Sequence, residues 1–327
     1  MPEAYSHKLV LTHLRVFLIL SVILLPLCFH PGQFVSFSDT IDKYEDKELA
    51  KKSTCGIKID AILLRNHTKY FRELGNIIYS RSFGVYIIAY SSFRHKYDGY
   101  HVYVGLAISK DLSSWVDIGE VVSHAEDPYL VEWNNTLYLF AEYKGPDNVH
   151  IGIGLWIANS LKNWSFHSLI LRSQIIKDIT HYDVSSPVVW YDKKWHMMFE
   201  LRRRKRGFAG QIYMIDGESP TKWNLTAKLV LGENIYDNVV PDDLLLFNKS
   251  GLLLFHRFNN TKWVTHLSAF SPDAPPIEIY KDLPNDLMFY INTDPITTGK
   301  IYLMGIDKFK TKIVLYELDC SSLEITI

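Results

Sequence analysis

The sequence predicts an all-β fold, a five-bladed β-propeller, and three observations support it. The 327 residues include 20 Tyr, 17 Phe and 8 Trp, with short runs of Val, Ile and Thr, a composition typical of strands. One pattern of short strands recurs roughly every 50–60 residues, which indicates a radial repeat. The inner strand of each repeat is continuously apolar, as expected when both faces of a sheet are buried. A β-sandwich or barrel is the alternative, but neither explains the spacing.

Each repeat opens with a polar start and an apolar strand, followed by a turn and a second apolar strand. The clearest copy is 126–131 with 137–140, and a Trp often begins the fourth strand. The other four repeats begin at Gly75, Ser185, Pro241 and Thr293. We expect residues 56–64 to supply a strand to the last blade, which would close the ring.

The first residues predict a targeting segment rather than part of the fold. Lys8 and Arg15 precede an apolar stretch at 16–29, and acidic residues follow it. This charge pattern favours a single-pass type II anchor with the rest of the chain in the lumen of the Golgi or ER. The alternative is a cleaved signal peptide and secretion. The predicted parts are a cytosolic tail and signal-anchor (1–35), a luminal stem (36–55) and the propeller (56–327).

Glycosylation sequons and cysteines fit a luminal location. Of three cysteines, Cys28 lies in the apolar segment, so Cys55 and Cys320 are the candidate disulfide at the two ends of the propeller. Six Asn-x-Ser/Thr sequons are candidate glycosylation sites. They are Asn66, Asn134, Asn163, Asn224, Asn248 and Asn259.

Charge gives no reason to expect a nucleic-acid partner, because the formal net charge is −1. The basic run at 202–206 is interpreted as a solvated loop, with anion binding as the alternative. The sequence has no phosphate loop, nucleophile elbow or zinc-protease motif. Calcium would suit a carboxylate-rich site, but no compact ligand loop is present. We therefore predict no metal and no cofactor.

The repeat register nominates one face of the ring for function. Residues at the start of the first strand and the end of the second meet at the same mouth in every blade. Carboxylates are enriched there, and a pair of acids with separated pKa values is what glycosidic chemistry requires. An Asp before Pro also caps turns, which is the structural alternative. The catalytic candidates are Asp127, Glu200 and Asp243. The candidates for substrate binding are Asn76, Glu142, Asp183, Asp242, His256, Arg257 and Asp294. Three further residues, Trp133, Trp190 and Trp263, are expected either to stack on sugars or to pack in the core.

Two of these stretches, 126–130 with 137–140 and 186–189 with 195–200, resemble the five-bladed propellers of glycoside hydrolase families 43 and 32, the arabinanase, levansucrase and invertase superfamily. A closer likeness is to the N-terminal propeller domain of glucosamine inositolphosphorylceramide transferases. It is carried by residues 186–187, 197–200, 211–213 and 220–223.

The resemblance also shows departures. The hydrolases use a first-blade Asp, a position at which the resemblance aligns Asn76 of this chain, and a third-blade Glu, where this chain has Ser185 and Ser186. Asp127 alone fits their second-blade carboxylate. The transferases carry a separate glycosyltransferase domain, so the resemblance implies no transferase activity for these residues.

Three functions are compatible with these observations. The first is a luminal propeller that binds or processes glycans, is accessory to a glycosyltransferase partner, and lacks the standard hydrolase acids. The second is an active glycosidase-like enzyme with a rearranged pair, Asp127 with Glu200 or Asp243. The third is a protein-interaction propeller, which would not need a carboxylate-lined mouth. The predicted partners are a carbohydrate or glycolipid ligand and, through the N-terminal segment, a membrane.

Overall fold

The structure is a computed structural model in which the described part of the chain consists of strands and their turns. It describes residues 71–94, 101–112, 114–145, 147, 149–173, 182–203, 210–232, 238–247, 250–259, 261–283, 287–290, 300–306 and 313–319. Within these ranges no helix is long and apolar enough to cross a membrane. The predicted anchor, the stem, the closing strand at 56–64 and both cysteines of the candidate disulfide lie outside them.

The strands form five antiparallel sheets. Within each sheet, strands that are consecutive in the sequence are hydrogen-bonded neighbours. The first sheet holds β1 (Phe71–Ser80), β2 (Val85–Phe93), β3 (Val102–Ser109) and β4 (Trp115–Ser123). The second holds β5 (Ala125–Trp133), β6 (Thr136–Tyr143), β7 (Gly152–Ala158) and β8 (Trp164–Arg172). The third holds β9 (Tyr182–Tyr191), β10 (Trp195–Arg203), β11 (Gly210–Ser219) and β12 (Lys222–Leu231).

The last two sheets differ in completeness. The fourth holds β13 (Val239–Phe247), β14 (Ser250–Phe258), β15 (Trp263–Ser271) and β16 (Ala274–Leu283). The fifth has three strands, β17 (Met288–Phe289), β18 (Lys300–Ile306) and β19 (Ile313–Asp319). Four complete four-stranded blades are therefore present in the described residues, and the fifth sheet is smaller than predicted.

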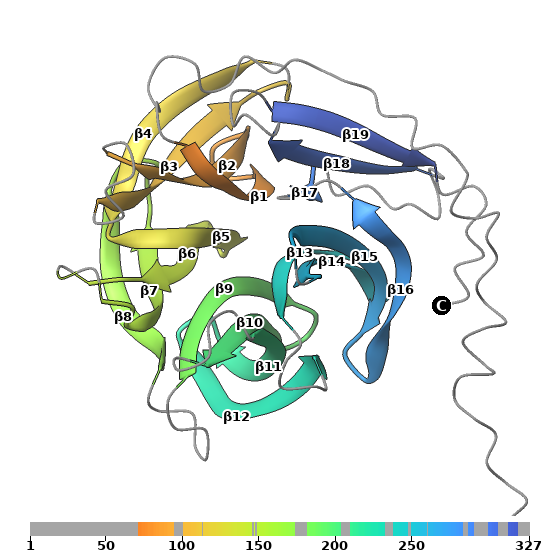
Figure 1. The fold of residues 1–327 in the computed structure, drawn as a ribbon. Coiled ribbons are helices and arrows are strands. Elements are labelled where there is room, and N and C mark those ends of the chain that lie inside the picture. The colour runs from red at the N-terminus through yellow and green to blue at the C-terminus, as the bar shows by residue number, and fades with distance from the viewer. Residues whose placement is uncertain are drawn as a thin grey trace, which may run out of the picture. The chain divides into compact units, whose positions relative to one another are not determined.

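The sheets are arranged radially around a central axis (Figure 1). Strands β1, β5, β9, β13 and β17 each contact the next in this order, and β17 also contacts β1. The prediction of a propeller is thus confirmed.

Apolar side chains fill the interfaces between neighbouring sheets. Ile88 and Tyr90 of β2 pack in one cluster with Met288 and Met304, which joins the first sheet to the last. Fully burying a side chain of this kind contributes about 1.5–3 kcal/mol. The first and last sheets are therefore joined by packing between them.

The repeat is also visible in the outer strands. The indole Nε1 of Trp115, Trp164 and Trp223 each donates a hydrogen bond to a backbone carbonyl three residues earlier, at 3.1, 3.2 and 2.9 Å. Each of these Trp residues lies at or next to the start of an outer strand. Their equivalence supports the register from which the mouth residues were predicted.

Each of the four complete sheets has an irregularity in the pairing of its inner strand. In β5 the register shifts between Glu126 and Tyr129, and in β1 between Leu74 and Ile77. Strands β9 and β13 have equivalent shifts opposite Met198/Glu200 and at Pro241/Asp243. A β-bulge re-aims the side chains of the extra residues. These bulges set the position of the candidate site.

Candidate functional site

A cavity of about 380 Å³ lies at the starts of the inner strands, and we call it the mouth pocket. Its walls come from all five sheets, the fifth contributing Met288 of β17. The residues that define it are Arg72, Glu73, Leu74, Gly75, Asp127, Pro128, Ser186, Pro187, Arg202, Val240, Pro241, Asp242, His256, Trp263, Leu287 and Met288. Of the predicted site residues, the structure brings together Asp127, Asp242 and His256 here, with Trp263 as the aromatic wall.

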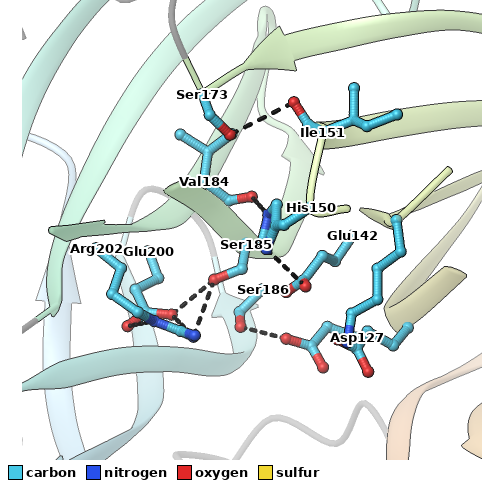
Figure 2. A network of polar contacts seen from close by, with 12 residues as sticks. Asp127, Glu142, His150, Ile151, Ser173, Val184, Ser185, Ser186, Glu200 and Arg202 are labelled. Atoms are coloured by element: carbon cyan, nitrogen blue, oxygen red, sulfur yellow. Dashed lines mark hydrogen bonds and ion pairs between the residues drawn. The ribbon is translucent and has the colours of Figure 1, made fainter. Parts of the chain in front are cut away.

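Asp127 is held by a bulge with a left-handed backbone, at φ 49°. Ser186 has the same φ of 49° at the equivalent place in β9, and its Oγ donates to Asp127 Oδ2 at 2.7 Å (Figure 2). The Asp127 amide donates to Ser91 Oγ at 3.0 Å. Left-handed backbone in residues other than glycine marks positions that the surrounding structure must hold in place. Both side chains are thereby fixed in the pocket wall.

The charge of Asp127 is stabilised from several directions. Burial raises its pKa, but the hydrogen bond with the Glu73 side chain, the Arg72 charge, the Ser186 hydroxyl and the Arg202 charge together lower it to about 2. No donor among the described residues reaches Oδ1 of Asp127, which is buried. Asp127 is therefore an ionised acceptor in the pocket at neutral pH.

Glu73 and Arg72 are pocket residues that the sequence interpretation missed. The first repeat was assigned from Gly75, whereas β1 begins at Phe71. Arg72 forms an ion pair with buried Glu126, which also pairs with Lys144. The sequence did contain a signal for this earlier start of the first repeat. Arg72 and Glu73 lie shortly before its apolar run, and the other repeats also open with polar residues.

The structure corrects the position assigned to Asn76. Its Nδ2 donates to Leu130 O at 2.9 Å and its Oδ1 accepts from Leu130 N at 2.7 Å, so it joins β1 to β5 away from the pocket. The first bulged residue of β1, equivalent to Asp127 in β5, is Gly75. A Cβ added to Gly75 would lie 2.2 Å from Pro128 O, so no side chain fits there.

Glu200 does not line the mouth pocket, which corrects its assignment to the mouth. It is fully buried, accepts from Arg202 Nη2 at 2.5 Å and Nε at 3.1 Å, and accepts from Ser185 Oγ at 2.6 Å. Figure 2 shows this cluster beside the Ser186–Asp127 contact. Glu200 therefore positions Arg202, and Arg202 is the residue that reaches the pocket.

Glu142 is likewise buried behind the pocket wall rather than in it. His150 Nδ1 lies 2.8 Å from Glu142 Oε1, and His150 Nε2 lies 2.7 Å from Val184 O, so the ring links β6 to β9 (Figure 2). Burial lowers the pKa of His150, but the hydrogen bond and charge of Glu142 outweigh it and raise the pKa. Asp183 adds to this effect through its charge and does not line the pocket.

On the fourth sheet, Asp242 and His256 form an ion pair through Asp242 Oδ1 and His256 Nδ1. The Trp263 ring meets the His256 ring edge to face, with centroids 6.3 Å apart and an angle of 84°. All three residues line the pocket. Arg257 does not; its guanidinium lies over the Phe255 ring, 5.7 Å from the centroid.

Asp243 belongs to a different cavity, which corrects its placement beside Asp127. This far cavity, of about 1010 Å³, is lined by later residues of the same inner strands, including Asn76, Tyr129 and Trp133. Asp243 accepts from Tyr129 Oη at 3.1 Å, Leu244 N at 2.8 Å and Phe289 N at 2.9 Å. Burial raises its pKa to about 7. Asp127 and Asp243 thus line two different cavities, although Asp243 directly follows Asp242 of the mouth pocket.

The remaining predicted sites divide between described and undescribed residues. The sequon residues Asn134, Asn163, Asn224 and Asn259 are all exposed. Asp294, Asn66, Asn248, Cys55 and Cys320 lie outside the described residues. Trp190 is buried and stacks on His196, which fits its packing alternative. Within the described ranges, no three His, Cys, Asp or Glu side chains are grouped as metal ligands.

No protein-family model matches the sequence, and no curated protein matches it either. Solved structures do match. A family 117 glycoside hydrolase of Zobellia galactanivorans aligns with a TM-score of 0.57 and 11% identity, over 81% of this chain and 90% of its own. A GH43 enzyme of Xanthomonas citri aligns with a TM-score of 0.56 and 11% identity, over 83% and 92%.

A third match is the β-1,2-mannobiose phosphorylase of Listeria innocua in complex with β-1,2-mannobiose. Its TM-score is 0.54 and its identity 9%, over 77% of this chain and 91% of its own. Identities this low show a shared fold and leave the family membership of the chain unassigned. The chain has the β-propeller fold found in carbohydrate-active enzymes of the glycoside hydrolase type.

Proposed function

We propose that the mouth pocket binds a carbohydrate. The observation that carries this proposal is the convergence of three bulged residues, Asp127, Ser186 and Asp242, beside the Trp263 ring in one concave site. Carboxylate and hydroxyl oxygens accept and exchange hydrogen bonds with sugar hydroxyls, and an aromatic face packs on the apolar face of a sugar ring. Pockets of this kind combine apolar walls with a few fixed polar groups.

The standard hydrolase acid set is absent from the equivalent positions. Gly75 stands at the first-blade position and Ser186 at the third, while Glu142 and Glu200 are buried in ion pairs behind the wall. These features favour glycan binding over the reaction of the family 43 and 32 enzymes. The similarity to enzymes that include a mannobiose-bound phosphorylase supports a carbohydrate as the ligand.

We further propose that the three-stranded sheet is a fifth blade, completed by residues 56–64 and fastened by a disulfide between Cys55 and Cys320. The contacts of β17 with both β13 and β1 support a fifth position in the ring. The exposed sequon residues support a luminal, glycosylated propeller behind an N-terminal anchor. In that setting the resemblance to the ceramide transferase propeller favours a role accessory to a glycosyltransferase.

A glycan array tests the binding proposal. The full chain, produced in a eukaryotic secretory host, is compared with Asp127→Asn and with the exposed control Asp273→Asn. We expect wild type and Asp273→Asn to bind the same glycans and Asp127→Asn to lose at least tenfold in affinity, since it loses a charged acceptor. Binding by none of the three proteins, with the fold intact by circular dichroism, would contradict the proposal.

A further inference from the structure

We propose that Arg202 contacts the bound sugar as a hydrogen-bond donor beside the acceptor Asp127, and that the two together select a neutral sugar with two adjacent free hydroxyls. This inference rests on the proposed carbohydrate-binding function and names the class of its ligand. Arg202 lies on β10, the second strand of the third sheet, at a position to which the resemblance to the hydrolases assigns no role.

One edge of the Arg202 guanidinium is anchored behind the pocket wall. Nε donates to Glu200 Oε1 at 3.1 Å, and Nη2 donates to Glu200 Oε2 at 2.5 Å. Nη2 also donates to Ser185 Oγ at 3.5 Å. A two-point contact with a carboxylate fixes both the position and the plane of a guanidinium. Arg202 is therefore held in one orientation before any ligand binds.

The other edge of the guanidinium is available to a ligand. A guanidinium has five N–H donors in a fixed plane, and the anchoring contacts leave the two on Nη1 unused by any acceptor in the described part of the chain. The Arg202 side chain is 33% exposed, whereas that of Glu200 is 1% exposed, and Arg202 lines the mouth pocket. Because the edge that contacts Glu200 faces the interior, Nη1 is on the pocket side.

The acceptor in the same wall is Asp127. Its Oδ2 accepts from Ser186 Oγ at 2.7 Å, while its buried Oδ1 has no donor among the described residues. Ser186 directly follows Ser185, whose hydroxyl contacts both members of the anchored pair (Figure 2). Burial raises the pKa of Asp127, and the Arg202 charge is among the neighbours that lower it, so the two charges lie near each other. A fixed donor and a fixed acceptor thus lie in one wall of the pocket.

The charges around the pocket favour a neutral ligand. Both guanidinium groups that line it are paired with buried glutamates, Glu126 and Glu200. Three carboxyl groups also line the pocket, and one of them is paired with His256. An anionic ligand would therefore meet carboxyl groups and cations that are already compensated, whereas hydroxyls can both donate and accept hydrogen bonds here.

Two neighbouring hydroxyls match this arrangement. Arginine only donates hydrogen bonds, and an ionised carboxylate only accepts them. Hydroxyls on adjacent carbons allow one oxygen to accept from Arg202 Nη1 while the other hydroxyl donates its proton to Asp127 Oδ1. If either hydroxyl is missing, a charged group of the wall stays unpaired, and this is costly for a buried oxygen. A site of this kind discriminates against analogues that lack the hydroxyl.

A deoxy series on the wild-type protein tests the ligand class without any variant. The probes are the methyl glycosides of glucose, galactose, mannose, xylose and arabinose as both anomers, their monodeoxy derivatives, and the methyl glycosides of glucuronic and galacturonic acid. Affinity is measured by isothermal titration calorimetry. For a glycoside that binds, we expect removal of either of two adjacent hydroxyls to weaken binding about tenfold or more, and removal of any other hydroxyl by less than about threefold. The uronides should bind no more tightly than the neutral glycosides.

Two variants assign the two hydroxyls. Arg202→Lys keeps a positive charge beside Glu200 but lacks the second edge of the guanidinium. It should bind the parent glycoside about tenfold more weakly and become insensitive to removal of one hydroxyl. Asp127→Asn should become insensitive to removal of the adjacent hydroxyl. Arg94→Lys is the matched control and should bind as wild type, because Arg94 forms a similar pair with Glu120 outside the pocket.

Several results would overturn the inference. They are binding of the uronides alone, sensitive hydroxyls that are not adjacent, two variants that lose sensitivity to the same hydroxyl, and wild-type binding by a folded Arg202→Lys. Binding to the glycan array by a wild type that binds none of the neutral glycosides would also overturn it. Absence of all binding on the array would instead overturn the proposed function.

Discussion

The mouth pocket and the far cavity each contain an aspartate of an inner strand, and the two have opposite electrostatics. Asp127 in the mouth pocket has a pKa lowered to about 2, whereas Asp243 in the far cavity has one raised to about 7. Burial acts in the same direction on both. The difference arises from the neighbours, since Asp127 lies near two guanidinium groups, whereas among the described residues Asp243 accepts from a phenol and two amides.

The comparison separates a binding group from a structural one. Two of the hydrogen bonds of Asp243 join β13 to β5 and β17, and the third is to the Leu244 amide within β13. Asp127 remains charged with one oxygen that no described donor reaches. A carboxylate in the centre of a propeller is therefore not a site residue by location alone; its neighbours decide.

The largest expected effect concerns Asp243. Because its folded pKa is raised from 3.8 to about 7, its favourable contribution is complete below pH 3.8 and is lost as the pH rises to 7. Asp243→Asn removes this dependence. Relative to wild type, the variant should gain about 4 kcal/mol of unfolding free energy between pH 4 and 8. Urea denaturation across this range measures it, and a pH-independent difference would contradict it.

Asp127→Asn should give the reverse dependence with a smaller size. The folded pKa is lowered from 3.8 to about 2, so the charge stabilises the fold above pH 3.8 and this contribution is lost as the pH falls to 2. The variant should therefore be less stable than wild type at pH 5, and this deficit in the free energy of unfolding should shrink by about 2 kcal/mol from pH 5 to pH 2. Denaturation curves at several acidic pH values test this. A stability deficit that grows as the pH falls would show that the pKa of Asp127 is not lowered in the folded protein.

Ser186→Ala is expected to have the smallest effect. It removes one donor to Asp127, which should cost about 1 kcal/mol at neutral pH and raise the pKa of Asp127. The carboxyl titration followed by NMR reports the second effect directly. The matched change Ser219→Ala, on the outer part of the third sheet, should leave that titration unchanged.

The propeller was predictable because its signal is repeated. Each strand is short and ambiguous alone, but Trp115, Trp164 and Trp223 recur with the same backbone contact. The register of the repeats also placed Asp127, Asp242 and His256 correctly at one mouth.

The site was less predictable because bulges change which side chains face the pocket. Glu142 and Glu200 lie in the second half of the second strand, but they do not line the pocket and pair with His150 and Arg202. Glu73 was missed because β1 extends further toward the N-terminus than its apolar run. A bulge of two residues cannot be seen in the alternation of a short strand, so the positions of Gly75 and Asn76 were exchanged.

The close approach of Gly75 to Pro128 also restricts the routes by which sequences of this kind can change. A first-blade carboxylate cannot arise here through one codon change, because any side chain would collide with the neighbouring backbone, 2.2 Å from its Cβ. Reinstalling it requires β1 and β5 to move apart together. A designer who wants the usual hydrolase chemistry from this scaffold would therefore have to rebuild two strands before adding one acid.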